Sequence, residues 1–281
     1  MNPWTSERDN LVKRLLATTP VDRSSWQSGA APSPVYELDD VLLQFNVPPT
    51  ALPWAESIYQ VGSQAIHPLT ERDENVRNYR WAETHFQERV SGQPLNPAPS
   101  YLDWPWHSEK YREQFKATDA RGREWWNSPF DHTYPERMWP KFNGHGEIRM
   151  GVRFDYGDLN DVVKLLVDDP FTRQAYLPIW FPEDTGSTMG QRVPCTLGYH
   201  FIRKGANLDM KYFIRSCDIT RHFHNDVYMA GRLLHWVVAA LQDEQDTFGV
   251  PYVGNLTMFI SNLHMFTADA WRYNTDGSPK Q

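Results

Sequence analysis

Both cysteines of the chain lie in the stretch PCTLGYHFIRKGANLDMKYFIRSCD, which begins at Pro194. Cys195 follows that proline, and Arg215, Ser216 and Cys217 follow one another near the end of the stretch. A neighbouring cation lowers the pKa of a thiol and enriches the nucleophilic thiolate. A guanidinium can also hold two oxygens of a phosphate. The residue types therefore favour a nucleophile beside an anion site. On composition alone, a lone cysteine near proline is more often a small buried hydrophobe, and Arg215 could equally pair with a surface carboxylate.

Three further polar residues have an ordinary structural interpretation. Asp226 follows Asn225 at the start of an apolar segment, where an aspartate would cap a helix. His264 lies in the apolar run SNLHMF, which is typical of a hydrogen-bonded core histidine, and we interpret Cys217 as structural. The sequence contains no metal-ligand spacing, phosphate-binding glycine loop, dinucleotide fingerprint or Gly-x-Ser-x-Gly elbow, so we expect no metal site.

A predicted β-hairpin positions the two ends of the cysteine stretch. Residues 196–203 and 208–215 are strand-like, and the turn between them has the composition Lys-Gly-Ala-Asn. That turn sets residue 203 opposite 208, so Cys195 is expected opposite Ser216. Strand alternation then puts the apolar residues of the second strand on one face and Arg215 on the other. Thiol, hydroxyl and guanidinium should gather at one end of the hairpin.

The remaining pattern predicts helices and strands. The length suits one large domain or two small ones, and we expect a single domain over 1–281. We expect helices over 4–18, 73–91, 158–167 and 224–241, a proline-rich loop over 92–106, and a short strand over 176–181 that Pro178 interrupts. No internal repeat or domain boundary is visible.

Bulk composition limits the classes of protein to which the chain can belong. With 281 residues, 40% of them hydrophobic, and two cysteines, it should be a globular protein of a reducing compartment, by default the cytoplasm. No run approaches the length of a membrane helix, so we expect no membrane partner. A net charge of −7 disfavours nucleic-acid binding but leaves room for a local cationic pocket.

Residues 156–266 resemble the thymidylate synthase family. Pro194-Cys195 is similar to the family's nucleophile motif, and the Arg215-Ser216-x-Asp218 segment follows at the family's spacing. The resemblance implies an α/β (α+β) fold with a large mixed sheet, a central buried helix and a sheet-to-sheet homodimer. It further implies that Cys195 is the nucleophile, that Arg215 and Ser216 bind phosphate, that Asp218 contacts the pterin of 5,10-methylenetetrahydrofolate, and that Arg173 serves the phosphate site of the dimer mate.

Residues 1–150 resemble the family less closely. Arg23 lies in a segment similar to the mobile loop that binds phosphate, and Glu83 lies in a segment similar to the helix with the catalytic glutamate. Trp104 and Trp106 are the counterparts of the tryptophans under the folate, and Tyr134 is that of the active-site tyrosine. These are residue-by-residue implications of the resemblance.

Asp226 stands where family members that act on deoxyuridylate have asparagine. An amide donates to uracil O4 and accepts from N3–H, whereas a carboxylate can accept from the amino group of cytosine. Asn225-Asp226 is similar to the pair in phage deoxycytidylate hydroxymethylases of this family. Other departures are Phe266 in place of a tyrosine that would share the sugar 3′-hydroxyl with His264, Gln174 in place of a second arginine, and a polar C-terminus.

The resemblance therefore implies that the protein hydroxymethylates C5 of dCMP with 5,10-methylenetetrahydrofolate. It would act in the cytoplasm, or in the host cytoplasm if a phage encodes it. Three alternatives remain open: a dCMP methyltransferase of the same family, a dUMP (hydroxy)methylase, and a non-catalytic homologue that binds nucleotides.

Overall fold

The computed structural model describes residues 3–24, 32–60, 74–103, 116–118, 124–126, 130, 132–140, 157–185, 193–244, 249 and 251–280. The helices are α1 Pro3–Leu16, α2 Ala51–Tyr59, α3 Glu74–Arg89, α5 Tyr134–Met138, α6 Leu159–Asp168, α7 Pro182–Thr185 and α8 Phe223–Glu244, with 3-10 turns η4 Pro99–Asp103 and η6 Thr267–Arg272. The strands are β1 Val21–Ser24, β2 Pro32–Asn46, β3 Lys116–Thr118, β4 Glu124–Trp126, β5 Tyr176–Pro178, β6 Thr196–Lys204, β7 Asn207–Ile214, β8 Cys217–Asp218 and β9 Tyr252–Phe266. Within these ranges, none of the helices combines the length and apolar character that crossing a membrane requires.

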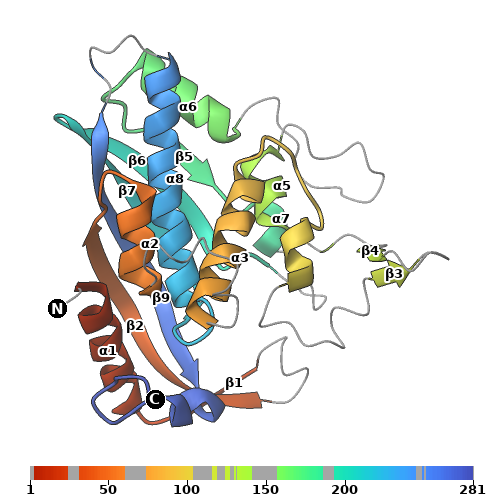
Figure 1. Ribbon diagram of the computed structural model, residues 1–281, viewed down its shortest axis with the longest axis vertical. Coiled ribbons are helices and arrows are strands. Elements are labelled where there is room, and N and C mark those ends of the chain that lie inside the picture. The colour runs from red at the N-terminus through yellow and green to blue at the C-terminus, as the bar shows by residue number, and fades with distance from the viewer. Residues whose placement is uncertain are drawn as a thin grey trace.

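A seven-stranded mixed sheet carries the fold (Figure 1). Its order is β1-β2-β9-β7-β6-β5, and β8 also pairs with β9. Neighbouring strands are antiparallel except that β7 and β8 run parallel to β9. A parallel pair needs a crossover between its strands, and α8 supplies it between β7 and β9. The expected mixed α/β sheet with a helix across it is therefore present.

Helix α8 packs along one face of the sheet, and α2, α3 and α6 pack against α8 (Figure 1). Most of its residues are buried, including Leu233, Leu234 and Val237. The alternate residues of β7 that face it, among them Met210 and Ile214, are buried as well. Removing one such leucine side chain would cost about 2–5 kcal/mol of folding free energy. The packing fixes where the first turn of α8 meets the ends of β6 and β7.

A glycine in α8 allows α2 to approach closely. The indole Nε1 of Trp54, on α2, donates to the Tyr228 carbonyl at 3.1 Å. A Cβ built on Gly231, one turn further along α8, would overlap that indole ring. The two helices therefore meet at a position that has no room for a side chain on α8.

The hairpin of β6 and β7 has the predicted turn and most of the predicted register. Arg203 pairs with Leu208, and the pairing continues to Gly198 opposite Phe213. A bulge at residue 197 then shifts the register by one. The Arg215 N–H donates to the Cys195 carbonyl at 2.9 Å, so Cys195 lies opposite Arg215 and the expected pairing with Ser216 is wrong. At the bulge, the carbonyl of residue 197 accepts from two N–H groups of the 179–180 segment.

The other face of the sheet carries exposed apolar side chains and, in the described ranges, no helix. Leu42 of β2 pairs with Phe259 of β9, and they are 61% and 37% exposed. The ring of Phe259 stacks on Phe213 at 5.0 Å, and Phe213 contacts Tyr176 at 6.4 Å. An apolar strip, defined here as Leu42, Phe259, Phe213 and Tyr176, thus crosses the sheet from β2 to β5.

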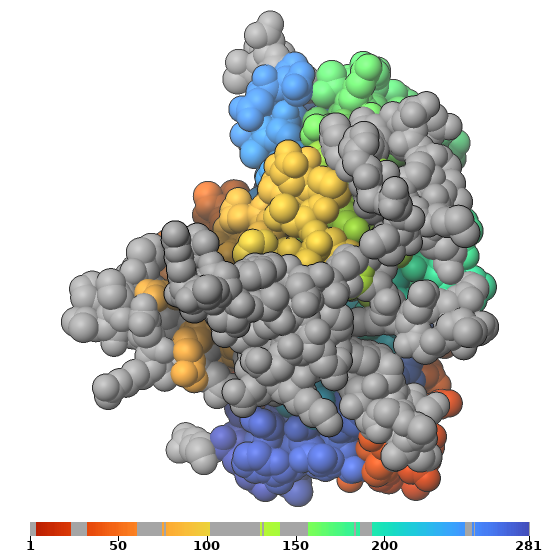
Figure 2. Space-filling view, turned by 90° about the vertical axis from the view of Figure 1, so that its right-hand side faces the viewer, coloured from red at the N-terminus to blue at the C-terminus, as the bar shows by residue number. Residues whose placement is uncertain are grey.

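The predicted helices are present, with ends that differ by a few residues. Helix α6 begins at a capping box in which Asp158 accepts from the Asp161 N–H and Asp161 accepts in return. The proline-rich segment over 92–106 is not loop throughout, because η4 occupies part of it. The strand expected over 176–181 stops at Pro178. Beyond β9, the C-terminal residues return beside the β1–β2 end of the sheet (Figure 2), where Arg221 pairs with Asp269 at 2.9 Å.

Candidate active site

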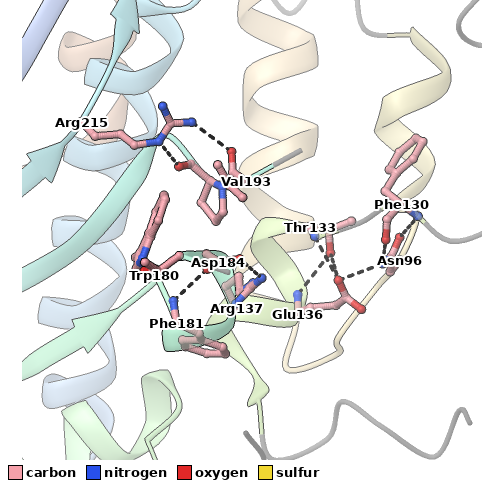
Figure 3. Close-up of polar contacts among 12 residues, drawn as sticks. Asn96, Phe130, Thr133, Glu136, Arg137, Trp180, Phe181, Asp184, Val193 and Arg215 are labelled. Atoms are coloured by element: carbon pink, nitrogen blue, oxygen red, sulfur yellow. Dashed lines mark hydrogen bonds and ion pairs between the residues drawn. The ribbon is translucent and has the colours of Figure 1, made fainter. Parts of the chain in front are cut away.

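The exposed thiol of Cys195 lies just before β6, at the end of the hairpin. Arg215 holds the segment that precedes it: its Nε donates to the Pro194 carbonyl at 2.8 Å and its Nη2 to the Val193 carbonyl at 3.3 Å (Figure 3). The guanidinium also lies 5.6 Å from the ring of Trp180. Among the described residues, Arg215 pairs with no carboxylate. Its charge is therefore available to a ligand, and its present partners fix the main chain next to the thiol.

A group of tyrosines lies behind Cys195. The hydroxyl of Thr196 donates to the Tyr134 hydroxyl at 3.3 Å and is 2.9 Å from the Tyr212 hydroxyl. Tyr212 stacks on Tyr199 with ring centroids 4.6 Å apart. Burial raises the pKa of Tyr134 far above its usual range, and the negative charges of Cys195 and Asp226 raise it further. At neutral pH these tyrosines are neutral phenols that can donate hydrogen bonds. Tyr134 therefore lies close to Cys195 through its contact with Thr196.

Asp226 is not the cap of α8. The helix begins at Phe223, and the Asp226 N–H already donates to the His222 carbonyl at 2.9 Å. Its Oδ2 is 3.6 Å from the Cys217 thiol, which donates to it. The carboxylate lies deep in the protein but keeps some solvent contact. Burial raises its pKa to about 6, although the charge of Arg89 and the bond from Cys217 act to lower it. Asp226 is thus a desolvated carboxylate, and the Cys217 thiol, 3.6 Å from its Oδ2, is only a weak hydrogen-bond donor.

Arg89, which the sequence did not single out, is the cation of this region. It is the last residue of α3, it is 4% exposed, and its Cζ lies 4.0 Å from the ring centroid of Tyr134. Its Nε has no hydrogen-bond partner within the described ranges. The charge of Arg89 acts to lower the pKa of Asp226. A basic residue in the last turn of a helix is common, so no local signal marked it.

Glu83 of α3 is held by the middle of α8. Arg232 donates to both of its carboxylate oxygens, at 2.9 and 2.8 Å, and the Tyr228 hydroxyl donates to Oε2 at 2.7 Å. Burial acts to raise the Glu83 pKa, but these bonds and one from Gln87 outweigh it and hold the pKa below its ordinary value. Glu83 is therefore an ionised carboxylate in an ion pair, and its partners come from residues beyond Asp226 on α8. To act on a ligand, Glu83 would first have to break its ion pair with Arg232.

Ser216, Asp218 and His264 gather where β8 pairs with β9. The Ser216 hydroxyl is 3.5 Å from His264 Nδ1, and burial lowers the His264 pKa to about 4. Asp218 is 4% exposed, and its Oδ1 accepts from the N–H groups of Thr220 and Arg221 at 2.9 and 3.1 Å. Burial raises the pKa of Asp218 to about 6. Its Oδ2 accepts no hydrogen bond from the described residues, although the Arg221 Nε lies 3.6 Å away.

Arg23 and Arg173, the other two arginines predicted to bind phosphate, lie on the surface. Arg23 of β1 pairs with Glu37 through bonds of 3.0 and 2.7 Å, and Glu37 is the cross-strand neighbour of His264. The side chain of Arg173 is exposed, and its carbonyl contacts His200 Nε2 at 3.0 Å. Trp104 and Trp106 lie outside the described residues.

Buried side-chain contacts hold helix α5, which carries Tyr134, in place. Arg137 of α5 donates to Asp184 of α7 at 2.8 Å, and both side chains are buried (Figure 3). The Asp184 Oδ2 accepts from the Phe181 N–H at 2.8 Å, and the Arg137 guanidinium lies 4.5 Å from the Phe181 ring. Removing one partner of such a buried pair costs about 3–5 kcal/mol. Helix α5 therefore holds Tyr134 on a rigid support.

Comparison with known proteins does not assign the chain to a family. No protein-family model matches the chain, and no curated protein matches it. Within the described ranges, no three histidine, cysteine, aspartate or glutamate side chains are grouped to hold a metal ion.

Proposed function

We propose that the protein hydroxymethylates C5 of dCMP, within a thymidylate synthase-like fold. The observation that carries the proposal is the combination of an exposed thiol, Cys195, with a desolvated carboxylate, Asp226, that acts on the same buried tyrosine, Tyr134. A nucleophile together with a carboxylate that could accept hydrogen bonds from the base would suit covalent attack on an electron-poor ring. The sequence resemblance names the ring as a pyrimidine.

Cys195 and Asp226 divide the chemistry between them. The thiolate of Cys195 would add to C6 of the pyrimidine, forming an S–C6 bond, and the electrons of the C5–C6 double bond would move to C5. Asp226 would accept hydrogen bonds from the exocyclic amino group of cytosine and from a protonated N3. Arg215 and Ser216 would bind the phosphate, with Arg23 and the partner subunit's copy of Arg173. His264 would contact the sugar. Neutral Tyr134 could donate to the ring or to a water.

One described residue, Asp218, could contact the expected folate. Asp218 keeps one buried carboxylate oxygen without a hydrogen-bond donor, and a pterin ring has N–H donors to offer it. 5,10-Methylenetetrahydrofolate would supply the one-carbon unit, so that dCMP, water and this folate give 5-hydroxymethyl-dCMP and tetrahydrofolate. Trp104 and Trp106 would stack on it. The resemblance gives Glu83 the proton transfers, but its ion pair with Arg232 favours a structural role.

A homodimer formed through the sheet is part of the proposal. The apolar strip supports it, because an exposed apolar surface of this kind on a sheet marks an interaction face. Exposed Arg173 would then reach the phosphate site of the partner subunit. Phe259→Asp should convert dimer to monomer in sedimentation equilibrium, whereas Tyr252→Asp, at an exposed aromatic outside the strip, should leave the dimer intact. A monomeric parent protein would contradict this part.

Product mass tests the proposed reaction directly. The protein is incubated with dCMP and 5,10-methylenetetrahydrofolate, and the nucleotide is analysed by mass spectrometry. A hydroxymethyl product is expected; a methyl product would instead identify a methyltransferase of the same family, and turnover of dUMP alone would identify a deoxyuridylate enzyme. Absence of folate-dependent tritium release from C5-labelled dCMP would favour the non-catalytic homologue.

A further inference from the structure

The Cys217 thiol contacts Asp226, the carboxylate proposed to accept hydrogen bonds from the base. Its Sγ lies 3.6 Å from Oδ2 of Asp226 and donates to it. Cys217 is 2% exposed, and burial, followed by the negative charge of Asp226, raises the pKa of its thiol well above the usual range. The thiol is therefore neutral and keeps the proton that it donates. A contact with a carboxylate goes beyond the packing role of an ordinary buried cysteine.

Backbone hydrogen bonds fix the chain between Cys217 and Asp226. Strand β8, which contains Cys217, pairs with β9. The Asp218 carboxylate then accepts from the N–H groups of residues 220 and 221, and the Asp218 carbonyl accepts from the His222 N–H at 3.0 Å. The His222 carbonyl in turn accepts from the Asp226 N–H at 2.9 Å. The thiol is thus held beside the first turn of α8 by the course of the main chain.

The two carboxylate oxygens of Asp226 have different surroundings. Oδ2 accepts from the thiol, whereas Oδ1 accepts no hydrogen bond from the described residues, and the residue keeps some solvent contact. The ionisable groups that act on Asp226 electrostatically, or on which it acts, are Arg89 of α3, Cys217 and Asp218 of β8, Tyr59 of α2, Tyr134 of α5, Tyr199 of β6 and Tyr212 of β7. Among these described groups, the Cys217 thiol is the one that forms a hydrogen bond with the carboxylate.

We propose that Cys217 is a positioning residue of the site: by donating to Oδ2, its thiol fixes the plane of the Asp226 carboxylate and leaves Oδ1 to accept from the base. The inference rests on the proposed function for its substrate. The two oxygens of an ionised carboxylate are equivalent acceptors until a donor engages one of them. A carboxylate held in one plane suits the amino group of cytosine, which donates in the plane of its ring. The weak thiol donor directs the carboxylate without satisfying it, as a hydroxyl would.

Two nearly isosteric substitutions test the bond without any nucleotide. In protein labelled with ¹³C-aspartate, the Cγ resonance of Asp226, assigned with Asp226→Asn, should titrate with a midpoint near pH 6 in the parent. Cys217→Ser offers the ionised carboxylate a stronger donor, which should lower the midpoint by about half a pH unit or more. Cys217→Ala removes the donor, which should raise the midpoint by about half a pH unit.

Ile219→Val is the matched control, because it trims another buried side chain of the same connection and removes no donor. Its midpoint should equal that of the parent. Midpoints that stay at the parent's value in both cysteine variants would overturn the proposal. Shifts of both variants in the same direction would overturn it as well, because a change in packing alone would not distinguish a stronger donor from a missing one.

The dissociation constant of dCMP at pH 8, measured by calorimetry, tests the positioning itself, because Asp226 is almost fully ionised at that pH in each of these variants. Cys217→Ala should weaken dCMP binding about tenfold, whereas Cys217→Ser and Ile219→Val should stay within about threefold of the parent. Unchanged affinity in Cys217→Ala would contradict the positioning role. If the parent binds no dCMP, the proposed function is wrong, and the titration alone decides whether the thiol holds Asp226.

Discussion

Helix α8 holds two carboxylates in opposite ways. In its middle, Arg232 and Tyr228 give Glu83 three hydrogen bonds, and the pKa of Glu83 is lowered. In its first turn, Asp226 has a thiol at 3.6 Å and a cation that does not touch it, and its pKa is raised to about 6. A carboxylate whose bonds are complete holds the fold together. One that is desolvated and short of donors has capacity for a ligand. We therefore expect a structural role for the middle of α8 and a chemical role for its first turn.

Removing the Cys195 thiol should have the largest effect on turnover. Cys195→Ala should lower kcat for dCMP by at least about a thousandfold and change its dissociation constant by no more than a few-fold, because the thiol acts in the covalent step. Single-turnover kinetics and calorimetry measure the two quantities. Turnover within about tenfold of the parent would mean that Cys195 is not the nucleophile.

The raised pKa of Asp226 predicts a dependence of stability on pH. Because its folded pKa is above its ordinary value, the group contributes most to stability below about pH 4, and that contribution is lost as pH rises through about 6. The loss amounts to at most about 3 kcal/mol. Asp226→Asn lacks it, so its unfolding free energy relative to the parent should rise by up to that amount between pH 4 and 8. Urea unfolding measures this, with Asp22→Asn as the exposed control. Parallel curves would mean that Asp226 is not desolvated.

The same substitution should change which base is preferred. Asp226→Asn restores a donor facing O4 and removes the acceptor for the cytosine amino group, which is worth about 1–3 kcal/mol, or roughly tenfold to a few hundredfold in the kcat/KM ratio. The ratio of kcat/KM for dCMP and dUMP in both proteins is the measurement. An unchanged ratio would remove the main reason for assigning cytidylate.

Breaking the ion pair in the middle of α8 should have the smallest effect. Glu83→Gln should lower the unfolding free energy at pH 7 by about 1–2 kcal/mol, because a bidentate pair that is partly exposed is lost. Since the Glu83 pKa is lowered, this contribution is present above its ordinary pKa near 4 and disappears as pH falls through the folded value. A double-mutant cycle with Arg232→Gln isolates the pair. A hundredfold loss of turnover without any loss of stability would instead make Glu83 catalytic and undo the comparison.

Local signals predicted the elements well and the site only in part. The turn composition and the alternation of apolar residues predicted the hairpin. No local pattern reveals the bulge at residue 197, whose carbonyl accepts from two N–H groups of the segment after β5. That bulge places Arg215, not Ser216, opposite Cys195. Asp226 was found through a departure from a family pattern. Arg89 was missed because the helix dipole explains a basic residue at a helix end, and only the packing of α3 against α5 buries it.

The close contact between Trp54 and Gly231 also sets the rotation of α8 about its own axis. Successive residues of an α-helix point about 100° apart, so a rotation of the helix by a single residue would carry the Asp226 carboxylate away from the Cys217 thiol. The Trp54 indole lies so close to α8 that only a glycine, Gly231, fits beside it. The hydrogen bond from the indole to the Tyr228 carbonyl holds the neighbouring turn of α8. An alanine at 231 would therefore act at a distance from the first turn, by misdirecting the carboxylate without touching any group that binds or reacts.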